Sequence, residues 1–156
     1  MKKIRQILYL FFWLVVCQLP GLAGAGCVKN HLDWYHALSR PPFTPPDAVF
    51  GLAWGILYIL LGICAWLVFK PGGQKRTKAL LLFIIQLALN SLWTPLFFGK
   101  QMLWPALVLL VLLLAEAGWL FKVIRAKHCL SAWLLTPYIA WLLFACYLNA
   151  GFAVLN

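Results

Sequence analysis

Few side chains in this 156-residue chain are suited to acid–base or metal chemistry. The histidines and carboxylates are His31, Asp33, His36, Asp47, Glu116 and His128. Phosphate-binding loops, zinc-binding helix motifs and nucleophile elbows are missing from the sequence. His31, Asp33 and His36 lie close together, but such loop residues are more often solvated than bound to a metal. The sequence therefore predicts no metal site and no certain catalytic residue, and it favours a binding protein over an enzyme.

Amide and aromatic side chains recur at helical spacing in three apolar stretches. These residues are Trp54 and Tyr58, then Gln86, Asn90 and Trp93, then Tyr138, Trp141, Ala145 and Asn149. Side chains three or four positions apart share one face of a helix, and hydrocarbon gives no reason for amides within a span. We therefore expect three helices to aim these side chains at one cavity at a common depth. Interhelical hydrogen bonding is the alternative role for Gln86 and Asn90.

The elements that position these residues follow from composition. Hydrophobic residues make up 65% of the chain and charged residues 10%, which is outside the range of ordinary globular domains. Apolar runs lie at about 4–26, 47–69, 78–98, 102–124 and 131–154, each near the roughly 20 residues that cross a bilayer as a helix. The first run is long for the core of a cleaved signal peptide, so we expect it to be retained. The sequence predicts an all-α membrane protein, a single domain over 1–156 with five transmembrane helices.

A proline-rich segment separates the first two runs. Four prolines fall within six positions, at Pro41, Pro42, Pro45 and Pro46. Proline removes backbone donors and forces extended geometry, so no helix is expected to pass through. Irregular backbone near the hydrocarbon is tolerated only against protein or water. The segment within residues 34–54 is therefore predicted to be a lid loop over the mouth of the cavity.

The basic residues divide unequally between the two sides of a five-span topology. One side has Lys2, Lys3, Arg5, Lys70, Lys75, Arg76, Lys78, Lys122, Arg125 and Lys127, and the other has Lys29, Arg40 and Lys100. This bias predicts a cytoplasmic N-terminus and an external C-terminus. No basic run is long or interleaved with stacking aromatics, so the bilayer is the expected partner and nucleic acid is not.

Two further features of the spans concern the pairing of a buried acid and the packing of a helix. Glu116 is the only acid inside a span, and pairing with Arg76 or Lys78 near the inner surface is the favoured interpretation. Gly51 and Gly55 form a Gly-x-x-x-Gly motif that permits close helix approach. That approach is expected either within one subunit or in a dimer.

Several motifs along the chain match a known family. They are Trp-Tyr-x-x-Leu-x-x-Pro-x-Phe-x-Pro-Pro at 34–46, Gly-x-x-Trp-x-x-Leu-Tyr at 51–58, Gln-Leu-Ala-Leu-Asn at 86–90, Pro-Leu-Phe-Phe-Gly at 95–99, and Pro-Tyr-x-x-Trp with Phe-Ala and Leu-Asn over 137–149. In these motifs the chain resembles the translocator protein family, the tryptophan-rich sensory proteins (TspO/MBR, peripheral benzodiazepine receptor-like). The motifs run from residue 34 nearly to the C-terminus, so the resemblance covers most of the chain.

The resemblance implies five transmembrane helices and a homodimer. It also implies binding of tetrapyrroles such as protoporphyrin IX, as a ligand and not as a required cofactor. Bacterial relatives are associated with light-dependent porphyrin breakdown, in which the indoles of Trp54 and Trp141 would be the catalytic groups. Trp54 and Trp141 match two tryptophans of the family's ligand pocket, and Ala145 matches a small residue of its wall. The expected ligand-binding residues are Trp34, Phe43, Trp54, Tyr58, Gln86, Asn90, Trp93, Tyr138, Trp141 and Ala145.

Two departures from the family pattern bear on the ligand and the membrane. Phe43 stands where the family usually has tryptophan, which keeps a ring but loses its N–H donor. Nothing basic follows Tyr147, so the cholesterol-type pattern of the mitochondrial members is incomplete. The bacterial inner (plasma) membrane, with a periplasmic C-terminus, is therefore preferred over the mitochondrial outer membrane.

The function expected from these features is that of a membrane receptor for large planar hydrophobic ligands, above all tetrapyrroles. Promotion of their photo-oxidative degradation, or stress sensing, is the expected further role. The alternatives are a transporter or channel for a small hydrophobic or anionic solute, and a member that binds sterols or drugs. The inverted repeat of many carriers is missing from the sequence, so transport ranks lower.

Overall fold

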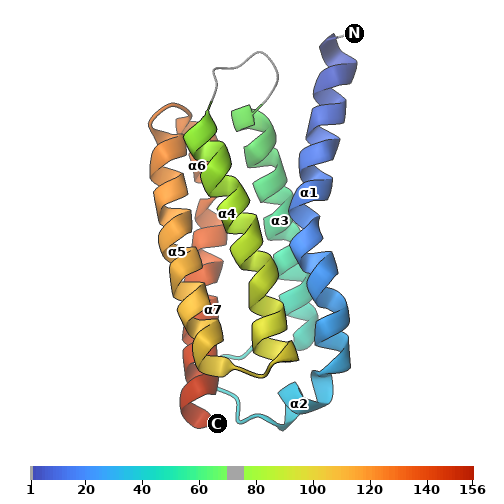
Figure 1. Ribbon diagram of the computed structural model, residues 1–156, viewed down its shortest axis with the longest axis vertical. Helices are drawn as coiled ribbons and strands as arrows, with labels where there is room; N and C mark the ends of the chain where they lie inside the picture. Colours follow the sequence, from blue (N-terminus) through green and yellow to red (C-terminus); the bar gives the residue numbers. More distant parts are fainter. Residues whose placement is uncertain (1, 70–75) are drawn as a thin grey trace.

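The computed structural model describes residues 2–69 and 76–156, and within them all regular structure is helical (Figure 1). The helices are α1 (Lys2–Asn30), α2 (Leu32–Ala37), α3 (Asp47–Phe69), α4 (Thr77–Thr94), the π-helical turn η1 (Pro95–Gly99), α5 (Leu103–Arg125), α6 (Cys129–Trp133) and α7 (Thr136–Leu155). Five stretches are long and apolar enough to cross a membrane: Lys3–Asn30, Asp47–Phe69, Thr77–Gly99, Leu103–Arg125 and Cys129–Leu155. The predicted bundle of five membrane-spanning helices is confirmed.

Prolines mark the points where two of the spans become irregular. Pro95 begins η1, so the third span ends in a wider π-helical turn. Pro137 lies in the first turn of α7, and a short non-helical turn at 134–135 separates α7 from α6. Proline lacks the N–H that would continue the preceding helix, which explains why the fifth span is divided there.

The N-terminal half of α1 packs tightly against α3 through a glycine. A Cβ atom added at Gly62 would lie 3.0 Å from the Cα atom of Leu14 and 3.2 Å from its backbone nitrogen. Farther along α1, a Cβ at Gly24 would lie 2.9 Å from the side chain of Thr94 on α4. Helices in a membrane associate mainly by van der Waals packing, so these small residues allow α1 to approach its neighbours.

Replacing Gly62 by leucine is expected to lower the free energy of unfolding by about 1–3 kcal/mol, the usual cost of overpacking. The neighbouring atoms belong to the Leu14 backbone, which has little freedom to move. Unfolding by a denaturing detergent, followed by circular dichroism, measures the change. Gly118→Leu is the matched control, because a Cβ at Gly118 has no neighbouring atom within 4 Å. Equal stability of the two variants would contradict the close α1–α3 contact.

The proline-rich segment between α2 and α3 is irregular, as predicted, and it is bound to the end of α7. A Cβ atom at Gly151 would lie 2.5 Å from the Pro41 ring. The Tyr147 hydroxyl donates to the Pro42 carbonyl at 3.0 Å. At the chain end, the Asn156 side chain accepts from the Ser39 backbone N–H at 2.8 Å and donates to the Ser39 carbonyl at 3.1 Å. The segment therefore crosses from α2 to the C-terminal end of α7.

The two chain termini lie at opposite ends of the bundle (Figure 1). The N-terminal end has Lys3, Arg5, Arg76, Lys78, Lys122, Arg125 and Lys127. The C-terminal end has Lys29, Arg40 and Lys100. Lys70 and Lys75, and the side chain of Lys2, lie outside the described part of the chain. The basic residues that are described are thus more numerous at the N-terminal end than at the C-terminal end. The compartment that each end faces stays a prediction.

Candidate functional site: an aromatic cavity at the C-terminal end of the bundle

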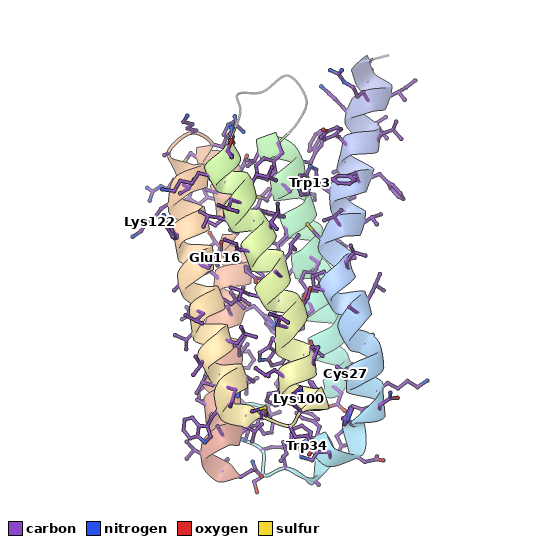
Figure 2. The ribbon with its side chains drawn as sticks, in the orientation of Figure 1. Trp13, Cys27, Trp34, Lys100, Glu116 and Lys122 are labelled. Atoms are coloured by element: carbon purple, nitrogen blue, oxygen red, sulfur yellow. The ribbon has the colours of Figure 1, made fainter. Side chains whose placement is uncertain are left out.

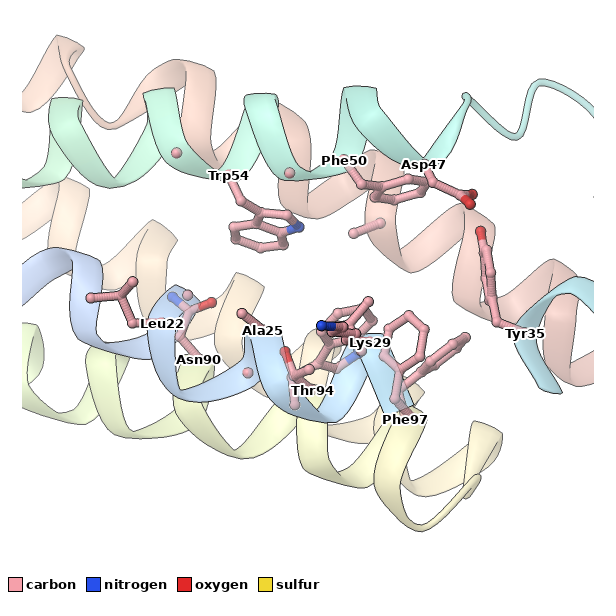
Figure 3. Close-up of a pocket in the computed structure, with 18 of the residues that line it drawn as sticks. Leu22, Ala25, Lys29, Tyr35, Asp47, Phe50, Trp54, Asn90, Thr94 and Phe97 are labelled. Carbon is pink, nitrogen blue, oxygen red and sulfur yellow. The ribbon is translucent and has the colours of Figure 1, made fainter. Parts of the chain in front are cut away.

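A cavity of about 490 Å³ lies in the half of the bundle that is nearer the C-terminus (Figure 3). Its wall is built by α1, α2, α3, α4, η1 and α7. The volume falls within the roughly 300–1,000 Å³ of small-molecule sites in proteins. Most of the surface is apolar, with a few amides, two tyrosines and charged residues at the edge.

Flat aromatic rings from three elements form one continuous wall. The ring of Trp54 on α3 stacks on Tyr58, with centroids 5.5 Å apart and planes at 30°. Trp54 also lies 6.4 Å from Trp93 on α4, and Trp93 stacks on Phe97 of η1 at 5.2 Å and 29°. Figure 3 shows Trp54 and Phe50 facing Asn90 and Phe97 across the cavity. Such a wall offers planar surface to a flat apolar ligand.

The amides of the wall are held in defined orientations by other side chains. Asn90 Nδ2 donates to the Tyr138 hydroxyl at 2.6 Å. The indole N–H of Trp93 donates to Asn149 Oδ1 at 3.2 Å, and Asn149 Nδ2 donates to the Leu103 carbonyl at 2.8 Å. Gln18 Nε2 donates to the carbonyl of Gly55 at 3.3 Å. These bonds join α1, α3, α4, α5 and α7 around the cavity.

The short helix α2 covers the C-terminal end of the cavity. Leu32 and Tyr35 line it, and Tyr35 packs against Phe98 and Phe152 with centroids 5.5 and 5.3 Å away. The Arg40 guanidinium lies over the Tyr35 ring at 5.3 Å. Burial raises the pKa of Tyr35, an effect that outweighs the nearby guanidinium charge, so its hydroxyl stays protonated at neutral pH.

An ion pair attaches α2 to the start of α3. His36 Nε2 and Asp47 Oδ2 are 2.6 Å apart, and both side chains are partly exposed. His36 is thus engaged with α3, and His31 Nδ1 lies 2.8 Å from the Cys27 carbonyl. None of residues 38–46 lines the cavity. The proline-rich lid is therefore not confirmed: the segment runs to α7, and α2 occupies the covering position.

The cavity also opens sideways between α1 and α3. Leu22, Ala25 and Lys29 line it from one face of α1, yet they remain exposed, Leu22 by 70%. On α3, Gly51 and Gly55 line the cavity, and a Cβ at either would meet no atom within 4 Å. The expectation that this Gly-x-x-x-Gly motif packs a helix closely within the subunit is therefore wrong, because both glycines border open space.

Half of the predicted ligand contacts lie on the cavity wall. Trp54, Tyr58, Asn90, Trp93 and Ala145 line it. The sequence interpretation missed Phe50, Phe97 and Phe98 on the wall, and also the small residues Gly21, Gly24 and Ala25 of α1. The run of small residues over 21–26 was the available signal for the α1 side, since small side chains leave room beside a helix.

The other five predicted contacts lie behind the wall or away from it. Trp34 packs edge-on against Phe97 and Phe98, at 5.9 and 6.4 Å, outside the lining. Phe43 is 86% exposed and has a positive φ of 63°, in the irregular segment. Gln86 and Tyr138 are fully buried deeper in the bundle.

Trp141 lies behind Trp54. Their ring centroids are 6.4 Å apart and the planes meet at 86°. Trp141 instead lines a separate shallow apolar groove between α3 and α7, with Ile56, Leu60 and Phe144 among its neighbours. A direct contact between Trp141 and a ligand in the cavity is therefore not supported by this geometry.

The predicted ion pair of Glu116 is wrong within the described residues. Both carboxyl oxygens of Glu116 are buried and lack a hydrogen-bond partner. Arg76 donates to the Val68 carbonyl, and the Lys78 ammonium lies 5.1 Å from the Trp119 ring centroid. Each basic group that was expected to pair with Glu116 is thus engaged near the N-terminal end of the bundle.

Five membrane-length helices around an aromatic cavity define an integral membrane protein with a chamber of small-molecule size. The chain belongs to the TspO/MBR family, whose model matches residues 11–155. It is similar to a tryptophan-rich protein TspO of Archaeoglobus fulgidus, 39% identical over 138 residues, 87% of this chain and 89% of that protein. It is also similar to the human translocator protein, 40% identical over 121 residues, 76% of this chain and 72% of the human protein. A tryptophan-rich sensory protein of Cereibacter sphaeroides is 36% identical over 147 residues, 91% and 87% of the two chains.

Proposed function

We propose that this protein binds a large planar hydrophobic ligand in the cavity, and that the ligand is a tetrapyrrole of the protoporphyrin IX type. The observation that carries the proposal is the continuous wall of Trp54, Tyr58, Trp93 and Phe97, whose rings stack or lie tilted against one another. A flat macrocycle presents its own π surface to such rings, and aromatic pairs in these arrangements attract each other.

Polar groups at the cavity edge support a ligand with acidic substituents. Lys29 lines the exposed edge of α1, and no ion pair involves it among the described residues. Its ammonium suits a propionate at the edge of a porphyrin, since a charge-assisted bond forms there without full burial. Asn90 and Asn149 add hydrogen-bonding groups deeper in the cavity. The ligand's apolar macrocycle would then lie against the rings, with its carboxylates toward the surface.

The proposal extends to the membrane setting and to the fate of the ligand. The N-terminal end, with the larger number of basic residues, faces the cytoplasm of a bacterial inner membrane, so the cavity lies in the outer half of the bilayer. Light-dependent oxidation of the bound porphyrin by oxygen is the further step, for which Trp54 and Trp93 are the indoles of the wall. A homodimer is the proposed assembly, on the resemblance to the family alone.

Titration of protoporphyrin IX into the protein in lipid nanodiscs tests the binding proposal. We expect saturable quenching of tryptophan fluorescence with one porphyrin per chain, because Trp54 and Trp93 line the cavity and two further indoles pack against its wall. Empty nanodiscs of the same lipid measure porphyrin that merely partitions into the bilayer. Quenching that rises linearly without saturation, at a level explained by partitioning, would exclude the cavity as a porphyrin site.

A further inference from the structure

A layer of buried polar side chains crosses the bundle beneath the cavity. Gln86 lies nine residues after the start of α4, and Glu116 lies nine residues before the end of α5. At about 1.5 Å per residue both are roughly 13–14 Å from the N-terminal end of the bundle. Gln86 is fully buried and Glu116 is 8% exposed. Tyr138 of α7 is also fully buried, beside Gln86 and within electrostatic range of Glu116. Figure 2 shows Glu116 about midway along the bundle.

Four polar atoms of this layer lack hydrogen-bond partners within the described residues. They are both side-chain heteroatoms of Gln86 and both carboxyl oxygens of Glu116. An unpartnered buried polar group costs about 1–3 kcal/mol, so native structures rarely leave several together. Gln86 stands beside the Tyr138 hydroxyl, and Glu116 is within electrostatic range of it. Gln86 is therefore close enough to Tyr138 for a hydrogen bond, and Glu116 is another polar side chain at the same depth without a partner among the described residues.

No opposite charge reaches Glu116 from the packed helices that are described. Among the titratable groups, Tyr138 on α7 interacts electrostatically with Glu116, and Tyr58 on α3 interacts with Tyr138. Arg76 and Lys78, on the neighbouring helix α4 and its N-cap, are engaged at the bundle end. An ionised carboxylate without a counter-charge is expensive in hydrocarbon, so a neutral acid that both donates and accepts is the form that suits this position.

One hydrogen bond connects the layer to the cavity. Asn90, which lines the cavity, donates from Nδ2 to the Tyr138 hydroxyl at 2.6 Å. Since that hydroxyl oxygen accepts the hydrogen bond from Asn90, its own O–H is free to donate toward Gln86. A ligand group that accepts from this same N–H of Asn90 competes with Tyr138 for it. When Tyr138 loses the hydrogen bond from Asn90, its hydroxyl can reorient, and this changes the hydrogen bonds open to Gln86 and Glu116.

We propose that Tyr138, Gln86 and Glu116 form a buried hydrogen-bonded relay, which signals the occupancy of the cavity to a neutral Glu116 through Asn90. The inference rests on the proposed function, because the occupant of the cavity is taken to be the porphyrin. The relay gives the protein a response to its ligand at a distance from the cavity wall. It uses a carboxyl group that ligand binding itself does not touch.

Infrared difference spectroscopy on porphyrin binding tests the relay, with protein in nanodiscs and protoporphyrin IX as the probe. The wild-type protein is expected to show a protonated-carboxyl band that shifts when the porphyrin binds. In Glu116→Gln the band and its shift disappear. The porphyrin's own carboxyl signals appear in both proteins, so they cancel when the variant's difference spectrum is subtracted from that of the wild type. In Tyr138→Phe the band remains, but its ligand-induced shift is lost, because the connection to Asn90 is broken.

Asp33→Asn is the matched control, because Asp33 is exposed in α2 and does not line the cavity. It should keep both the band and the shift. Porphyrin absorbance recorded on each sample reports binding, and so it tests the proposed function separately from the relay. Binding without any change in the Glu116 band would overturn the relay and leave the proposed function standing. A shift that persists in Tyr138→Phe would also overturn it, and absence of porphyrin binding would overturn both.

Discussion

Porphyrin binding is expected to weaken about tenfold to a hundredfold when Gly55 is replaced by phenylalanine. Gly55 lines the cavity, and a Cβ atom there meets no other atom within 4 Å, so the new ring enters the cavity without disturbing a helix contact. Because Gly55 lines the cavity together with Trp54 and Tyr58, the new ring occupies part of the space proposed for the macrocycle. Overpacking costs about 1–3 kcal/mol, and about 1.4 kcal/mol corresponds to a factor of ten in affinity.

The matched control for this variant is Gly26→Phe. A Cβ atom at Gly26 also meets nothing within 4 Å, but Gly26 is exposed on α1 and does not line the cavity. Both variants exchange the same residues in a membrane-spanning helix, so effects of hydrophobicity and helix propensity cancel. The dissociation constant of protoporphyrin IX, from its visible absorption, is measured for each. Equal affinities for the two variants would show that the porphyrin binds elsewhere.

The sequence was sufficient for the spans and for the amides that face inward. Apolar runs of spanning length determine the helices because hydrocarbon accepts only backbones that satisfy their own hydrogen bonds. Asn90 and Trp93 were correctly expected to face inward with Gln86, because the lipid gives amides no partner and helical spacing puts all three on one face. Trp54 and Tyr58 were expected to face the same cavity because their spacing also puts them on one helix face, and both line it.

Trp141 shows what helical spacing leaves open. At 100° per residue, Ala145 lies about 20° from Tyr138 around α7, whereas Trp141 lies about 60° away on the same side. That offset is enough to turn its ring toward the groove between α3 and α7. Spacing assigns a residue to a stripe, but the width of the stripe that reaches a cavity depends on the neighbouring helices.

Long-range contacts account for the remaining differences. The prolines predicted an irregular segment, but its course depends on Pro41 meeting Gly151 and on Tyr147 bonding to the Pro42 carbonyl, more than 100 residues away. The sequence motif of Gly51 and Gly55 is the same whether a helix or a cavity lies opposite, so the motif alone does not predict which is present. Glu116 had two basic groups at a suitable depth, and only the fold shows that Arg76 bonds to the Val68 carbonyl instead.

Replacing Trp54 by leucine is expected to weaken protoporphyrin binding about tenfold or more. Trp54 is the largest ring on the α3 side of the wall, and it contacts Tyr58 and Trp93. Leucine keeps an apolar side chain but removes the planar face, and stacking on an aromatic ring is worth about 1–3 kcal/mol in other flat ligands. Trp54→Phe should recover part of the affinity, because it restores a ring. The porphyrin's own absorption reports binding, since removing a tryptophan changes the protein's fluorescence.

Trp104→Leu and Trp141→Phe separate a contact with the ligand from a general loss of tryptophan. Trp104 is 58% exposed at the start of α5, so its loss should leave the affinity unchanged. Trp141 supports Trp54 from behind, so its replacement should weaken binding less than Trp54→Leu does. The sequence treats Trp54 and Trp141 as an equivalent pair, whereas the structure makes one a wall residue and the other its support. A larger loss from Trp141→Phe than from Trp54→Leu would place the ligand in the groove between α3 and α7 instead.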